Sequence, residues 1–234
     1  MNVPPLHRIN IAIDGPAGAG KSTVARMVAK ALQYIYVDTG AMYRAVTLKA
    51  LESGLPIEDN DRVGRLANEL DIVLLPGVDS QRVLVNGEDV SLRLRSLEIN
   101  RSVSYVARLE TVRARMADLQ RRMALEKGVV MDGRDIGTHV LPNAELKVFL
   151  TASPRERASR RFRELGPEAG ITLGQLEKEI SERDRLDQER EIAPLLQASD
   201  ARLIDSTGRT VDEVVEEIVQ WGLAAARTIL AEEK

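Results

Sequence analysis

The stretch from Gly15 to Ser22 constrains this chain more than any other part of the sequence. It reads Gly-Pro-Ala-Gly-Ala-Gly-Lys-Ser and fits the pattern G-x-x-x-x-G-K-[ST] at every fixed position. An alternating apolar run from Ile9 to Ile13 precedes it, and apolar residues at helical spacing follow it from Val24 to Leu32. A strand, a glycine-rich loop and a helix N-terminus in this order turn backbone N–H groups toward an anion. The pattern therefore predicts a site for nucleotide phosphates.

Two side chains of this loop have separate expected roles. Lys21 reaches the outer phosphates, and the Ser22 hydroxyl is a ligand for Mg²⁺. The alternative interpretation, a glycine-rich turn with a surface lysine, is disfavoured by the strand before the loop and the helix after it. The residues expected at the nucleotide are Gly15, Pro16, Ala17, Gly18, Ala19, Gly20, Lys21, Ser22 and Thr23.

Composition excludes several other classes of protein. The 234 residues suit one α/β domain with a small insertion. A net charge of -3 and 3% aromatic residues disfavour binding to a nucleic acid polymer, because neither a basic field nor stacking platforms are present. Without cysteine, and with only two isolated histidines, the chain has no disulfide and no zinc cluster. No apolar run is long enough for a membrane, so we expect a cytoplasmic protein without membrane contact.

Strand and helix signals alternate along the rest of the chain. Thr39, Ser153, Thr172 and Thr210 are expected as helix N-caps. Further core strands are predicted at 34–38, 129–132, 147–150 and 201–205, and helices at 39–53, 58–70, 109–127, 154–165 and 172–190 and after 210, with 92–107 left ambiguous. This order predicts an α/β fold of three layers, with a five-stranded, mostly parallel sheet that binds ligands at its carboxyl edge. Asp14, Asp38, Asp132 and Asp205 end strands there, and Asp132 is expected to support Mg²⁺.

Two segments depart from the core pattern. The stretch from Asp71 to Val90 is predicted to form a small antiparallel insertion, because it has short strands, a Pro76–Gly77 turn and an Asn86–Gly87 hairpin turn. Together with the helix before it, the insertion is expected to span 58–95. At 153–190 two charged helices joined by a Gly/Pro break indicate a lid, with a solvated helical hairpin as the alternative. The single domain then has its core at 1–57, 96–152 and 191–234.

Three activities compete once a phosphate loop is present. A GTPase switch would need Asn-Lys-x-Asp, which the sequence lacks, and a motor ATPase would have a glutamate base where this chain continues Gly133-Arg134-Asp135. Transfer to a small acceptor instead predicts arginines for a second phosphate. The candidates are Arg44, Arg134, Arg183 and Arg190.

Four stretches together resemble the bacterial cytidylate kinase family. They are IAIDGPAGAGKST, Asp38-Thr39-Gly40-Ala41-Met42-Tyr43-Arg44, Asp132-Gly133-Arg134-Asp135-Ile136-Gly137-Thr138, and Glu182-Arg183-Asp184 with Asp187 and Arg190. The resemblance spans nearly the whole chain and implies a P-loop nucleoside monophosphate kinase. It implies transfer of the γ-phosphoryl group of ATP to CMP or dCMP with Mg²⁺, in a monomer.

The resemblance also implies roles for single residues. Lys21, Arg134, Arg183 and Arg157 would be catalytic, Ser22 and Asp132 would serve the metal, and Arg157 and Arg161 would close over ATP with the lid. Arg44, Arg134 and Arg183 would hold the CMP phosphate, Ser104, Arg113 and Asp135 the cytosine, and Tyr43 and Asp187 the sugar, with Thr39 and Arg190 at the same site. Serine is common in the family where this chain has Thr39, which keeps the hydroxyl.

Two kinds of alternative remain open at this point. The acceptor could be UMP, AMP or shikimate instead of CMP, which a panel of acceptors would distinguish. The chain could also be a regulatory module that binds Mg-ATP without transferring phosphate. The preference between CMP and dCMP stays open.

Overall fold

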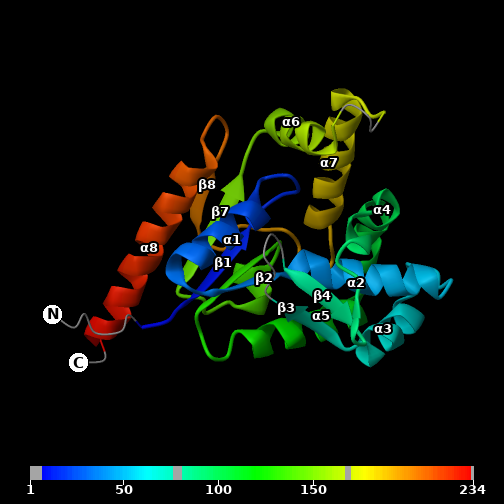
Figure 1. Cartoon of the computed structure of the whole chain (residues 1–234), viewed down its shortest axis with the longest axis horizontal. Coiled ribbons are helices and arrows are strands. Elements are labelled where there is room, and N and C mark those ends of the chain that lie inside the picture. The colour runs from blue at the N-terminus through cyan, green and yellow to red at the C-terminus, as the bar shows by residue number, and fades with distance from the viewer. Residues whose placement is uncertain (1–6, 76–80, 167–169, 233–234) are drawn as a thin grey trace.

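The centre of the molecule is a parallel sheet of five strands. The computed structural model describes residues 7–75, 81–166 and 170–232, drawn in colour in Figure 1. The strands lie in the order β2 (Ile35–Asp38), β6 (Val129–Gly133), β1 (Asn10–Asp14), β7 (Leu146–Thr151) and β8 (Arg202–Asp205). All four pairings are parallel, and the register places Asp38 beside Asp132 and Asp14 beside Gly133. The predicted α/β sheet of five strands is confirmed.

Alternation along β1 separates the two faces of this sheet. Ile11 and Ile13 pack with α1 (Lys21–Leu32) and α8 (Val211–Glu232) on one face. Ala12 faces the other way and packs with residues of α5 (Glu110–Met123) and η2 (Ile136–Val140), a turn of π-helix. Helical layers on both sides of the sheet give the three-layer arrangement.

A further hydrophobic cluster lies beside the main sheet. It joins the inner faces of α2, α3, α4 and α5 to the small antiparallel sheet. The helices and strands of this region that have not been introduced above are α2 (Thr39–Glu52), α3 (Asn60–Glu69), β3 (Ile72–Leu75), β4 (Arg82–Val85), β5 (Glu88–Asp89), η1 (Arg93–Arg95) and α4 (Leu97–Val106). At the expected hairpin, Asn86 and Gly87 both have positive φ, of 51° and 82°, which suits the tight turn between β4 and β5.

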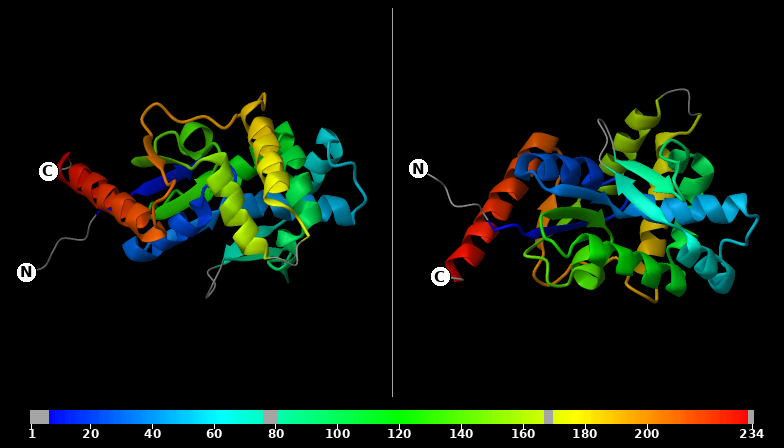
Figure 2. Two further views of the ribbon diagram at one scale, coloured as in Figure 1. Left: turned by 90° about the horizontal axis from the view of Figure 1, so that it is seen from above. Right: turned by 60° about the horizontal axis from the view of Figure 1, so that its bottom comes forward.

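The two charged helices project from the carboxyl edge of the main sheet (Figures 1 and 2). They are α6 (Pro154–Leu165) and α7 (Leu173–Gln188), which begin at the predicted caps Ser153 and Thr172. Ala158, Leu176 and Ile180 form a small core between them. The helices are therefore packed against each other rather than simply solvated, although most of their surface is polar.

Several boundaries differ from those expected. Asp38, not Thr39, caps α2, because its carboxylate accepts from the Ala41 N–H at 2.8 Å. The helix expected over 109–127 ends at Met123. It does not extend to Lys127, because Lys127 and Gly128 adopt left-handed backbone. The helix expected over 172–190 ends at Gln188.

Two further expectations also need correction or restriction. The strand expected to be buried at 34–38 lies at the edge of the sheet, with Ile35 56% exposed. The ambiguous stretch 92–107 contains η1 and α4. The Pro76–Gly77 turn and Pro167 lie outside the described residues.

Candidate active site

The phosphate loop joins β1 to α1 as its sequence predicts. Gly15 has a φ of 148°, and a Cβ at this position would lie 1.9 Å from the Leu150 carbonyl oxygen, so only glycine fits. Gly20 caps α1 with a φ of 89°. Lys21 is buried, and its Nζ donates to the Pro16 carbonyl at 2.7 Å, which folds the side chain over the loop. Burial and the neighbouring Arg134 lower the pKa of Lys21, a cost that a bound phosphate would relieve.

Asp132 lies opposite the first turn of α1 and receives two side-chain hydrogen bonds. The Ser22 hydroxyl donates to one carboxylate oxygen and the Tyr36 hydroxyl to the other, both at 2.9 Å. Burial and the adjacent Asp38 raise the pKa of Asp132 to about 6, against the opposing effects of Lys21 and both hydroxyls. A hydroxyl and a carboxylate beside a phosphate loop are hard oxygen donors of the kind that Mg²⁺ binds together with substrate phosphates. Among the described residues no group of three or more His, Cys, Asp or Glu residues could hold a metal by itself.

Three of the predicted phosphate arginines converge beside this acid. Arg44 on α2 pairs with Asp38 at 3.2 Å, and Arg134 after β6 pairs with Asp187 on α7 at 2.8 Å. Arg183 on α7 makes no hydrogen bond or ion pair within the described part of the chain, and its Nε is buried without a partner. Burial and the positive charge of Arg134 lower the pKa of Arg183 to about 10. Asp187 and Asp184 act in the opposite direction, so the guanidinium has acidic neighbours but its Nε has no hydrogen-bond acceptor among the described residues.

The residues predicted for base recognition form a buried group on the far side of the arginines. Arg113 on α5 is 2% exposed, donates to the Asp135 carboxylate and to the Ala107 carbonyl, and lies 5.7 Å from the centre of the Tyr43 ring. Ser104 on α4 is buried nearby and lines the same cleft. Asp135 lines the cleft, where its carboxylate can accept a hydrogen bond from a polar heterocycle, whereas Arg113 does not line the cleft and lies behind Asp135 as its ion-pair partner.

The cleft is also lined by three further residues of the predicted acceptor site: Asp187, Arg190 and Thr39. The Arg190 Nη2 lies 3.6 Å from the Asp187 carboxylate and is buried without a hydrogen-bond partner among the described residues. Burial alone would raise the pKa of Asp187, but Arg134, Arg190 and Arg183 outweigh it and hold that pKa below its usual value. The Thr39 hydroxyl donates to the Asp132 carbonyl at 2.6 Å, so it is already engaged with the core.

The lid arginines occupy different positions from one another. Arg157 is buried, with Nη1 2.5 Å from Asp184 and 2.9 Å from the Ala17 carbonyl, and it does not line the cleft. Asp184 also accepts from the Ala17 N–H at 3.0 Å. Arg161 does line the cleft and pairs with Glu164 at 3.0 Å. Arg160, which sequence reasoning passed over, donates to the Ala19 and Ser206 carbonyls from the same wall.

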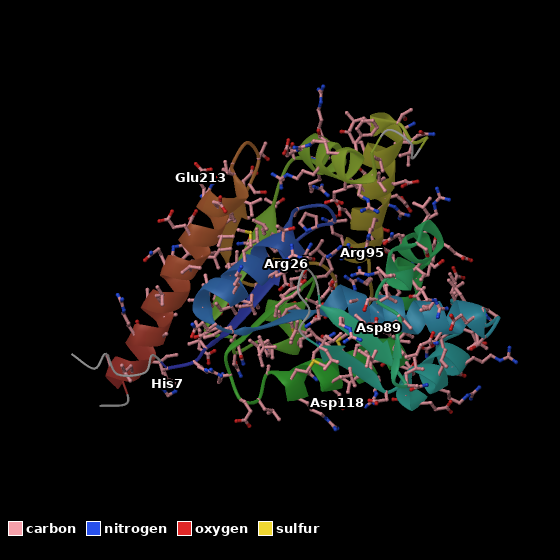
Figure 3. All side chains as sticks on the ribbon, in the orientation of Figure 1. His7, Arg26, Asp89, Arg95, Asp118 and Glu213 are labelled. Carbon is pink, nitrogen blue, oxygen red and sulfur yellow. The ribbon has the colours of Figure 1, made fainter. Side chains whose placement is uncertain are left out.

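One cleft of about 1850 Å³ is lined by most of these groups, although not by Arg113 or Arg157. It runs from the phosphate loop past the arginines to α4 and α7, and Arg95 lies at its α4 side (Figure 3). Its volume exceeds the usual range for a site that holds one small ligand. The cleft therefore has room for two ligands that share a central cationic region.

The acids expected at the strand ends do not all join the site. Asp38 and Asp132 lie side by side, and Asp14 accepts from the Ile136 and Gly137 N–H groups, which fixes the segment after Asp135. Asp205 is exposed and accepts from the Thr207 N–H, so it closes a turn.

Tyr36 and Asp184 had no predicted role. The alternation of Tyr36 with Asp38 on β2 could have indicated Tyr36, whereas nothing local indicates the contact of Asp184 with Ala17.

Comparisons with known proteins agree on one family. The family model described as cytidylate kinase matches residues 11–222. A cytidylate kinase of Exiguobacterium sibiricum is 51% identical over 223 residues, which cover 95% of this chain and 100% of that protein. One of Geobacillus kaustophilus is 53% identical over 214 residues, 91% and 96% of the two chains. A gluconokinase structure from Sinorhizobium meliloti, 16% identical with a TM-score of 0.50 over 97% of this chain and 99% of that one, shares the fold. The match to the family model and the identity to these relatives place the chain in the cytidylate kinase family.

Proposed function

We propose that this chain transfers the γ-phosphoryl group of ATP to CMP or dCMP, giving ADP and CDP or dCDP. The observation that carries the proposal is Arg183, a half-buried side chain in the cleft lining whose Nε has no hydrogen-bond partner among the described residues and which lies near Arg134, Arg44 and Lys21. A second phosphate beside the nucleotide phosphates would supply an anion for this guanidinium to bind. Family membership and this charge arrangement point to the same chemistry.

The reaction needs positive charge and geometry more than proton transfer. A nucleoside monophosphate has a second pKa of about 6, so its attacking oxygen is already largely ionised near neutral pH. The difficulty is the repulsion between two polyanions, which Lys21 and the arginines reduce by binding both phosphates. A histidine base is not required, in keeping with the absence of His7 and His139 from the cleft lining.

Mg²⁺ fits the donor set at Ser22 and Asp132. We propose that the Ser22 hydroxyl is a ligand and that Asp132 holds the ion directly or through water. Mg²⁺ held by these residues would supply positive charge that offsets the negative charge of the ATP phosphates. Tyr36 orients the carboxylate by its hydrogen bond.

Cytosine would be read by the buried pair Arg113 and Asp135, with Ser104 beside them. A carboxylate accepts from the 4-amino group, and a guanidinium donates to O2 or N3. Uracil would place a carbonyl against the carboxylate, and such a mismatch in a desolvated site can cost about 10⁴-fold in rate. Tyr43 packs under Arg113 and Asp187 lies near the phosphate arginines, so we propose that they orient the sugar, with Arg190 between them.

The lid residues complete the proposal. We propose that 153–190 closes over ATP to exclude water, with Arg161 approaching the phosphates. Arg157 donates to the Ala17 carbonyl of the phosphate loop, so we propose that it positions this loop for the nucleotide. The insertion 58–95 and the core segments are proposed as one folding domain, and the chain as a monomer. Within the described residues, no helix has the length and apolar character to span a bilayer.

A panel of acceptors tests the function. CMP, dCMP, UMP, AMP and shikimate are each supplied with Mg-ATP, and ADP release is followed for the wild type and for Lys21→Met. We expect rapid release with CMP and dCMP, slow release with the others, and loss of the signal in the variant. Mg-ATP binding without acceptor-dependent ADP release would instead favour a regulatory module.

A further inference from the structure

Gln81 lies against the open edge of the main sheet. β2 is an edge strand, so within the described residues no strand lies beside its outer backbone groups. The Gln81 Oε1 accepts from the Asp38 N–H at 2.9 Å, and its Nε2 donates to the Tyr36 carbonyl at 2.5 Å. One side chain therefore makes the two hydrogen bonds that a further strand would make at this point. Gln81 directly precedes β4, so the contact also joins the antiparallel insertion to the core.

The two residues held in this way both act on the site. Tyr36 and Asp38 are two apart on β2, and side chains two apart on a strand share a face. The Tyr36 hydroxyl donates to Asp132 at 2.9 Å. The Asp38 carboxylate pairs with Arg44 at 3.2 Å and caps α2 at Ala41. The backbone that Gln81 fixes thus carries the groups that orient the metal-side acid and one phosphate arginine.

We propose that Gln81 is a positioning residue for phosphoryl transfer, which holds Tyr36 and Asp38 so that Asp132 and Arg44 keep their places. This rests on the proposed function. The chemistry requires a primary amide, because one acceptor and one donor are needed at the same end of the side chain. A carboxylate can accept from Asp38 but cannot donate to Tyr36.

Removal of the amide has a defined kinetic consequence. In Gln81→Ala, water replaces the amide at the two backbone groups of β2, with a net loss of one or two hydrogen bonds. Tyr36 and Asp38 are then held less firmly, and so are Asp132 and Arg44, which they contact. We expect kcat/KM for CMP to fall about tenfold, equivalent to about 1.4 kcal/mol. KM for ATP should rise less than KM for CMP, because the described contacts of Gln81 do not include the phosphate loop, and Lys21 and Ser22 remain in place there.

Two further variants separate positioning from general destabilisation. Gln81→Glu keeps the length of the side chain but loses the donor and places a charge near Asp38, so its loss should equal or exceed that of Gln81→Ala. Gln197→Ala is the matched control: Gln197 also donates its Nε2 to a backbone carbonyl, that of Ala201 at 3.0 Å, but lies on a loop that does not line the cleft. It should leave both kinetic constants unchanged. Melting temperatures of all three confirm folding at the assay temperature.

Amide hydrogen exchange gives a readout that needs no turnover. The Asp38 N–H should be protected in the wild type, exchange faster in Gln81→Ala, and remain protected in Gln197→Ala. If the wild type releases no ADP with CMP, the proposed function is wrong. The exchange measurement still shows whether Gln81 protects the Asp38 N–H. The inference is overturned if both Gln81 variants keep kcat/KM for CMP within about twofold of the wild type, or if KM rises equally for ATP and CMP.

Discussion

Asp14 gives the chain a pH-dependent stability that can be calculated from its surroundings. It ends β1 just before the phosphate loop, is 5% exposed, and accepts from the Ile136 and Gly137 N–H groups at 2.9 and 2.7 Å. Burial, with a smaller effect of Asp135, raises the pKa of Asp14 from 3.8 to about 7, although both amides and Lys21 act in the opposite direction. The folded protein therefore holds a proton that the unfolded chain has released at pH 5 or 6.

The sign of the effect follows from this difference in bound protons. Between pH 4 and pH 7 the folded state binds more protons at Asp14 than the unfolded state, so the free energy of unfolding falls as pH rises. The contribution is complete below the unfolded pKa and is lost once pH passes the folded pKa. The raised pKa spans roughly three units, and at 1.36 kcal/mol per unit the loss is about 4 kcal/mol.

Asp14→Asn removes this titration while it keeps the shape of the side chain. Urea unfolding of both proteins at pH 5, 6, 7 and 8 gives the difference in their free energies of unfolding, in which groups common to both cancel. We expect the difference to move in favour of the variant by about 1.4 kcal/mol per pH unit from pH 5 and to level off above pH 7. Parallel curves from pH 5 to pH 8 would refute the reasoning, because they would mean that the amides and Lys21 keep Asp14 ionised in the folded state.

Four substitutions in or beside the cleft give further predictions. Arg183→Met should lower kcat/KM for CMP by about 100-fold or more yet raise the melting temperature, because it removes a guanidinium that Arg134 repels and whose Nε is buried without a hydrogen-bond partner among the described residues; a lower melting temperature would contradict this. Arg44→Ala should weaken CMP binding by about 10- to 100-fold in a titration, without loss of fold in a thermal melt; unchanged binding would count against the phosphate role. Asp135→Ala should reduce turnover of CMP far more than affinity for ATP, and equal losses would remove its proposed role in base recognition. Asp184→Asn keeps an acceptor for the phosphate-loop N–H but removes the charge opposite Arg157, so steady-state assays should show a larger rise in KM for ATP than for CMP; the reverse order would exclude this coupling.

The sequence predicts those features whose causes are local. The phosphate loop is specified by neighbouring residues, since Gly15 and Gly20 need backbone that other residues reach only with strain. The caps Ser153 and Thr172 likewise act within three residues of themselves. The parallel order of the main sheet follows from the alternation of strands and helices, because parallel neighbours require a crossover between them. Apart from the close approach of the Leu150 carbonyl to Gly15, these features depend on residues that are near one another in the chain.

The features that sequence reasoning missed depend on contacts made across the fold. Thr39 is a good cap by residue type, but the Asp132 carbonyl accepts its hydroxyl, and this leaves the cap to Asp38. Gln81 lies 43 residues from Asp38, and Asp184 lies 167 residues from Ala17. No local pattern records either pairing. Such contacts have to be observed in the folded chain.

Aspartates in and beside the cleft offset the repulsion among its arginines in the protein without ligands. Arg44, Arg134 and Arg113 each have an aspartate partner, which offsets the desolvation of a buried charge. Arg183 makes no ion pair among the described residues; burial and Arg134 lower its pKa, against the weaker attraction of Asp187 and Asp184. A phosphate that binds there breaks no existing ion pair and relieves repulsion from Arg134, whereas at Arg44 it must share the guanidinium with Asp38. We therefore propose that the acceptor phosphate gains most on binding at Arg183, where the guanidinium has no ion pair with a described residue to exchange.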